Sequence, residues 1–144
     1  MDDNENLKVL KEIHKGAQMG MDAISYVSDK VVDDDFKREL SSQHNQYDDI
    51  LTRVNDLYTN YGEVPNDGNL KDQFMTWMGV QMNTINDKSN SKISELLIQG
   101  TTMGIIEGRK ILNNNPTADK EIKNILGDFV KLQENSVEKL KIYL

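Results

Sequence analysis

The spacing of apolar residues limits the fold of this chain more than any other feature of its sequence. In residues 4–31 they recur at steps of three and four, which places them on one face of a helix. The same spacing returns in residues 34–61, 91–112 and 116–144, and over a shorter stretch at about 70–85. No segment alternates between apolar and polar residues as a half-buried strand would. We therefore predict an all-α protein.

The distances between these segments predict how the helices connect. Only a few residues separate the first long segment from the second, and the third from the fourth, so each pair should form an antiparallel hairpin. Asn115 should cap the last helix and Pro116 should begin it. Residues 62–90 separate the second segment from the third, which is more than an up-down-up-down bundle needs. We predict one domain, residues 1–144, folded as a four-helix bundle with a crossover that is helical over about residues 70–85.

Composition excludes several classes of site and partner. There is no cysteine, which excludes disulfides, zinc–thiolate sites, iron–sulfur clusters and thiol nucleophiles. Lys and Arg number 17 against 24 Asp and Glu, a net charge of −7. Such a surface repels phosphate groups, so we expect neither nucleic acid nor an anionic membrane as a partner. No apolar run approaches the ~18 residues of a membrane span, and the acidic start differs from a secretory signal, so we expect a cytoplasmic protein.

The order of the predicted helices and the amino-acid sequences of three stretches resemble a known superfamily. The stretches are GAQMGMDAI at residues 16–24, WMGVQMNT at 77–84 and QGTTMGII at 99–106. Together they resemble the ferritin-like superfamily, and within it a group of small bacterial proteins related to rubrerythrins, a group that itself implies little about activity. Active members of the superfamily bind two iron or manganese ions through one Glu from each of two helices and a Glu-x-x-His pair from each of the others. This sequence contains no Glu-x-x-His pair. The resemblance thus implies a ferritin-like bundle whose metal ligands have been replaced.

Polar residues occupy positions on the predicted core faces near the place where such ligands would lie. Counting from the predicted turns brings most of them to similar heights along the bundle. The predicted polar cluster comprises His14, Gln18, Gln43, Tyr47, Gln99, Gln133 and Ser136. Replacing Glu by Gln removes the negative charge that a hard cation requires. The cluster is either a hydrogen-bonded network that fixes the register of the helices, which is the more common case, or a pocket for a small neutral ligand.

An irregular metal site is the alternative to a site that has lost its ligands. It would use His14, His44 and Glu107, of which Glu107 is expected to face inward and to pair with a base such as Lys123. Counting along the helices separates the two histidines by about two turns, which is too far for one compact site. We therefore expect neither metal ligands nor a cofactor, and we expect His14 to be a hydrogen-bonded core residue.

Glycines recur at four-residue steps inside two of the predicted helices. Gly16 and Gly20 are one such pair, and Gly100, Gly104 and Gly108 are another series. A smooth glycine face allows backbones to approach closely, so we predict tight packing of the first long helix against the third. The competing interpretation is that the glycines leave room for a ligand.

The crossover segment is apolar on more than one side. Phe74, Met78 and Ile85 fit the face that would lie on the bundle. The apolar residues left at the edge of that face or beyond it are Met75, Trp77, Val80 and Met82. A soluble monomer rarely exposes such a patch, and two-fold pairing is the commonest way to cover one. We predict a homodimer formed through this segment.

No nucleophile–base pair and no phosphate-binding loop is recognisable in the sequence. We expect a non-enzymatic binding or structural protein, on a ferritin-like scaffold that has lost its metal site, with a small molecule or a protein as its ligand. The alternative is a metal-dependent oxidoreductase or metal-storage protein that binds iron or manganese through the irregular ligand set.

Overall fold

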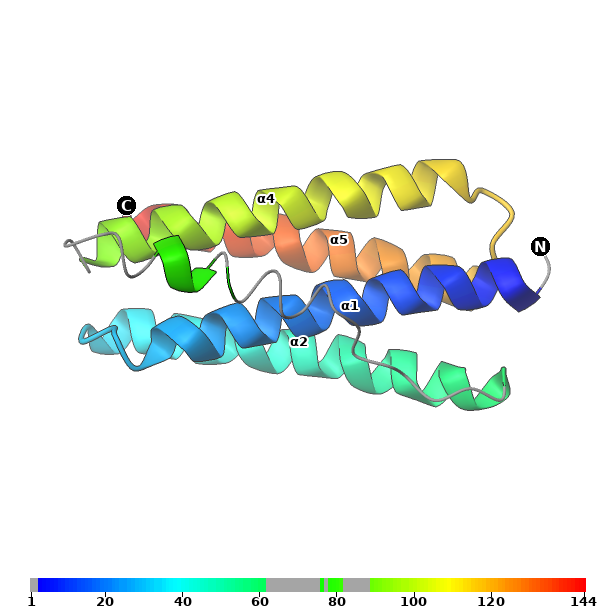
Figure 1. Cartoon of the computed structure of the whole chain (residues 1–144), viewed down its shortest axis with the longest axis horizontal. Coiled ribbons are helices and arrows are strands. Elements are labelled where there is room, and N and C mark those ends of the chain that lie inside the picture. Colours follow the sequence, from blue (N-terminus) through cyan, green and yellow to red (C-terminus); the bar gives the residue numbers. More distant parts are fainter. Residues whose placement is uncertain (1–2, 62–75, 77, 82–88) are drawn as a thin grey trace.

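The computed structural model describes residues 3–61, 76, 78–81 and 89–144. Four long helices lie side by side along one direction (Figure 1). They are α1 (Asp3–Ser28), α2 (Asp34–Asn60), α4 (Asn90–Asn114) and α5 (Lys120–Leu140), and a short 3-10 turn, η1 (Lys141–Tyr143), follows α5. No strand occurs in this part of the chain, so the prediction of an all-α protein is confirmed.

Two of the helix starts are fixed by side-chain caps. The carboxylate of Asp33 accepts a hydrogen bond of 2.8 Å from the backbone N–H of Phe36, and the hydroxyl of Ser89 accepts one of 3.3 Å from the N–H of Lys92. Each of these bonds satisfies an N–H group that has no partner within its helix. The last helix, by contrast, begins at Lys120, four residues after Pro116, so its predicted start was wrong. Instead of capping that helix, Asn115 donates back to the carbonyl of Ile111 in α4, at 2.8 Å.

The helices pack as two hairpins. α1 packs most extensively on α2, and α4 on α5, while α2 also contacts α5 and α1 contacts α4. Helices α2 and α4 begin at the same end of the bundle (Figure 1). The end of α2 and the start of α4 therefore lie at opposite ends of the bundle, as the length of residues 62–90 predicts. Residues 76 and 78–81, within the predicted crossover helix, are helical.

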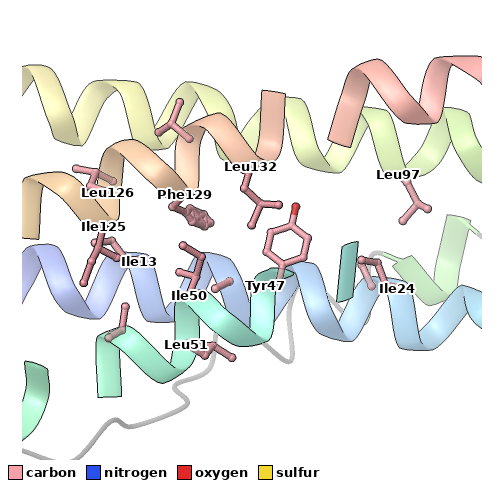
Figure 2. Close-up of a cluster of buried hydrophobic side chains, with 14 of the residues drawn as sticks. Ile13, Ile24, Tyr47, Ile50, Leu51, Leu97, Ile125, Leu126, Phe129 and Leu132 are labelled. Carbon is pink, nitrogen blue, oxygen red and sulfur yellow. The ribbon is translucent and has the colours of Figure 1, made fainter. Parts of the chain in front are cut away.

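The core consists of side chains from all four long helices. Figure 2 shows residues of α1, α2, α4 and α5 that converge on the axis of the bundle, with Tyr47 and Phe129 near its middle. At one end the ring of Phe36 stacks on that of Tyr143, with centroids 4.3 Å apart, and the hydroxyl of Ser94 bonds to the carbonyl of Leu140. These contacts hold the C-terminal residues against α2 and α4.

The part of the crossover that the structure describes has one buried and one exposed face. Met78 is fully buried and Val80 is 53% exposed, as predicted for these two residues. Met75, Trp77 and Met82 lie outside the described residues, and the association of two copies through this segment stays a prediction. No helix in the described ranges has both the length and the apolarity to cross a membrane.

Candidate functional site

A cavity of about 200 Å³ lies between α1 and α4. Side chains of α2 and α5, among them Gln43, Tyr47, Phe129 and Gln133, close its inner side. Most of its lining is apolar, and the buried aliphatic residues include Ile13, Ala23, Ile24, Leu96, Leu97 and Leu126. The predicted tight packing of the first long helix on the third is therefore wrong, and the competing interpretation, in which the glycines leave room for a ligand, stays a prediction.

The glycines of α1 admit two aromatic rings to the helix backbone. A Cβ atom built on Gly20 would lie 2.8 Å from the ring of Tyr47, and one built on Gly16 would lie 2.9 Å from the ring of Phe129. The rings themselves are 6.2 Å apart between centroids. The close approach that the sequence predicted between two backbones is therefore made by side chains of α2 and α5.

The glycines of α4 likewise let side chains of α5 pack against the backbone of α4. The amide of Gln133 lies against the backbone at Gly104, and a Cβ atom built on Gly108 would lie 2.8 Å from Cγ2 of Val130. Gly16, Gly20, Gly104 and Gly108 thus face the inside of the bundle, and both glycine series line the cavity.

Tyr47 joins three helices at the inner side of the cavity. Its side chain is 3% exposed, and Figure 2 shows it rising from α2 into the centre of the bundle. Burial raises the pKa of Tyr47 to about 12, and hydrogen bonds of its hydroxyl with Thr101 of α4 and Ser136 of α5 act in the opposite direction. The phenol therefore stays neutral at any physiological pH, and its hydrogen-bonding capacity is used within the protein.

Gln133 provides a buried hydrogen-bond acceptor that is not satisfied within the described structure. Its side chain is 3% exposed and lines the cavity, and its Oε1 atom has no hydrogen-bond partner among the described residues. Leaving a buried acceptor unsatisfied costs about 1–3 kcal/mol. Gln43 also lines the cavity and is buried, but its Nε2 donates to Glu39 Oε2 at 2.9 Å.

Charged side chains border the cavity where its lining reaches solvent. Glu12 and Lys15 of α1 line it and form an ion pair of 3.3 Å, and both are partly exposed. Glu107 of α4 also lines it and is 70% exposed, with Lys110 at 3.9 Å. The interior of the cavity is thus apolar with a few neutral polar groups, and its formal charges lie at the edge.

The predicted polar cluster is brought together only in part. Gln43, Tyr47 and Gln133 line the cavity, and Ser136 bonds to Tyr47 behind it. His14 is buried, as expected, but lies outside the lining, with its ring edge-on to Tyr58 at 6.2 Å between centroids.

Two further members of the predicted cluster are elsewhere. Gln18 is partly exposed and donates to Asp22 on its own helix, at 3.0 Å. Gln99 is exposed, so its predicted place in the core is wrong. It follows the buried Leu97 by two residues, which turns it about 200° around the helix.

Sequence reasoning missed Thr101, which lines the cavity and bonds to Tyr47. A signal for it was present, because Leu97, Thr101, Gly104, Gly108 and Ile111 recur at steps of three and four. This face has little apolar side-chain volume, so the stripe that contains Leu96, Met103 and Ile106 was the more conspicuous one.

The alternative metal-ligand set is not assembled. Glu107 is exposed, His44 is only half-buried, and Lys123, the predicted partner of Glu107, donates to the carbonyl of Pro116 at 2.8 Å. Across residues 3–61, 76, 78–81 and 89–144, no group of three or more His, Asp or Glu side chains could hold a metal ion.

No protein-family profile matches this chain, and neither a curated protein nor a solved structure does. The ferritin-like resemblance therefore stays a prediction, and the function has to be inferred from the cavity itself.

Proposed function

We propose that this protein is a non-enzymatic binding protein, on a ferritin-like scaffold that has lost its metal ligands, and that it holds a small, largely apolar molecule in the cavity between α1 and α4. The order of two hairpins joined by a crossover supports the scaffold. The neutral residues Gln43, Tyr47 and Gln133, in the interior where a metal protein would place carboxylates, support the loss of the metal site.

The observation that carries the proposal is the cavity itself. Its volume is about 200 Å³ and its lining is mainly apolar. An apolar cavity of roughly 150 Å³ is large enough to bind benzene, and packed protein cores leave few voids larger than a water molecule. Space of this size and character suits an apolar ligand with one or two rings.

The chemistry of the lining favours binding over catalysis. Among the residues that the structure describes, the lining contains no His, Ser or Asp, and the pKa of Tyr47, at about 12, keeps its phenol from acting as a base near neutral pH. Its remaining titratable groups, Glu12, Lys15 and Glu107, are partly or largely exposed. The interior of the cavity thus offers shape and hydrogen bonds rather than a reactive pair.

The proposal can be tested with naphthalene as a neutral apolar probe. Binding is followed through the backbone amide resonances of Gly104 and Gly108 in isotope-labelled protein. Ala23→Leu places a larger side chain in the cavity, because Ala23 is buried and lines it. Ser25→Leu makes a similar change at an exposed position of the same helix and is the matched control.

We expect saturable binding to the parent and to Ser25→Leu, and at least about tenfold weaker binding to Ala23→Leu, because the added carbon atoms occupy the ligand's space. The proposal is wrong if naphthalene does not perturb these glycines, or if Ala23→Leu binds as tightly as the parent. Thermal melts of both variants establish that they are folded.

A further inference from the structure

We propose that the natural ligand of the cavity is a neutral molecule with an apolar body and one hydrogen-bond donor, and that this donor binds Oε1 of Gln133. The inference rests on the proposed binding function and adds the chemical class of the ligand. The structure contains the acceptor, its place against the glycine face of α4, and a lining that selects against charged ligands.

The acceptor is identified by comparing the polar groups around the cavity. The hydroxyls of Tyr47 and Thr101 bond to each other, and Nε2 of Gln43 bonds to Glu39. Gln133 lines the cavity, and its Oε1 atom is buried and has no partner among the residues that the structure describes. An amide oxygen only accepts hydrogen bonds, so the group that satisfies it must be a hydroxyl or an N–H.

The position of this oxygen is set by the glycine face of α4. The Gln133 amide fits against the helix at Gly104, where an added Cβ would overlap Nε2, and its Oε1 lies 3.9 Å from the Cβ position of Gly108. An acceptor that is already in place lowers the ordering cost of binding a donor.

The electrostatics of the cavity favour a neutral ligand. A carboxylate has no donor for Gln133, and it would approach past Glu12 and Glu107 on a chain with a net charge of −7. An ammonium group would lose its hydration without meeting a buried carboxylate, because the described part of the lining contains no Asp and its glutamates, Glu12 and Glu107, are at the exposed edge. A hydroxyl or N–H on a neutral ring avoids both costs.

A water molecule is the other group that could satisfy the oxygen. A buried water normally makes two to four hydrogen bonds, and it needs a polar site to do so. The amide of Gln133 lies against the glycine face of α4, and the described lining of the cavity is mainly apolar. A ligand that brings both a donor and an apolar body fits these surroundings better than water.

Indole and benzofuran form a matched pair of probes for this proposal. They have nearly the same shape and size, but indole has an N–H donor where benzofuran has an oxygen. Gln133→Met removes the acceptor and keeps an unbranched side chain of similar length. Gln99→Met makes the same substitution at an exposed position of α4 and is the matched control.

We expect the parent and Gln99→Met to bind indole about tenfold more tightly than benzofuran, because only indole satisfies the buried acceptor. In Gln133→Met this preference should disappear, and benzofuran should bind at least as tightly as it does to the parent. Indoleacetate, which adds a carboxylate, should bind more weakly than indole.

Each result supports or overturns a defined part of the proposal. Equal binding of indole and benzofuran to the parent, or a preference that survives in Gln133→Met, would overturn the role of Gln133. If naphthalene still binds in that case, the proposed function remains intact. Indoleacetate that binds as tightly as indole would overturn the requirement for a neutral ligand. Failure of all the probes, naphthalene included, would overturn both proposals. If Gln133→Met does not fold, the ratio of the parent's affinities for indole and benzofuran still decides whether a donor on the ligand is required.

Discussion

The amide of Gln133 on α5 lies directly against the backbone of Gly104 on α4, in a space that a single methyl group on Gly104 would fill. Tyr47 and Gly20 are related in the same way across α2 and α1. In both cases a glycine inside a helix gives up helix propensity and admits a large side chain from another helix. The polar wall of the cavity therefore depends on residues that have no side chains.

Gly104→Ala should destabilise the protein, because the new methyl group overlaps Nε2 of Gln133. We expect a loss of about 1 kcal/mol in the free energy of unfolding, the low end of the cost of overpacking, because the displaced atom is at the end of the Gln133 side chain. In a Gln133→Ala background the overlap is gone, and the same substitution should stabilise by up to about 1 kcal/mol through helix propensity. Urea denaturation of the four proteins in this cycle measures both effects, and the absence of the sign change would disprove the contact.

Gly127→Ala should stabilise the protein. Gly127 lies inside α5, and a Cβ atom built there meets nothing within 4 Å in the described structure. Alanine is favoured over glycine within a helix by about 1 kcal/mol, so the unfolding midpoint in urea should rise. A decrease in stability would show that this face of α5 is packed more tightly than the structure indicates.

The stability of the protein should fall at alkaline pH because of Tyr47. Its pKa is about 12 in the folded protein, against 10.0 for an ordinary tyrosine, because burial disfavours the phenolate. As the pH rises above 10, the unfolded chain loses the proton before the folded protein does, which favours unfolding. The full difference in pKa corresponds to about 3 kcal/mol, of which about half should be lost by pH 11.

Tyr47→Phe is the control for this effect. The variant should be less stable than the parent by about 1–3 kcal/mol at neutral pH, because Thr101 and Ser136 lose a buried partner. It should nevertheless lack the part of the alkaline loss that belongs to Tyr47. Urea denaturation between about pH 9 and pH 11 gives both quantities, and parallel curves for parent and variant would contradict the assignment.

Val80 provides a test of the predicted homodimer. Its side chain is 53% exposed on the described part of the crossover, beside the fully buried Met78. We expect the parent to be dimeric in light scattering and Val80→Glu to be monomeric with unchanged helix content, because a buried unpaired carboxylate is costly. Val32→Glu, at a valine that is 87% exposed near the start of α2, is the matched control and should remain dimeric. A monomeric parent would end the prediction.

The broad fold could be read from the sequence because it depends on local signals. Periodicity indicated the four long helices, and short or long separations indicated two hairpins and a return path. Where a local signal was ambiguous the boundary was wrong, as at Pro116, which lies in the turn before α5 instead of in its first turn.

The buried polar residues of α2 and α5 could also be found from the sequence alone. Gln43, Tyr47, Gln133 and Ser136 occupy positions on strongly apolar faces, and such a face is buried whatever its partner is. On these helices the sequence itself determined which side lies inside.

Which face of helix α4 lies inside the bundle was decided only by the tertiary structure. Its sequence offers two faces, one with Leu96, Gln99, Met103 and Ile106 and one with the glycine series, and periodicity does not choose between them. In the fold Met103 and Ile106 are 62% and 49% exposed, because the side chains of Gln133 and Val130 occupy the inner space against the glycines. A glycine contributes no side-chain volume of its own, so whether it faces the core depends on what a distant helix places against it.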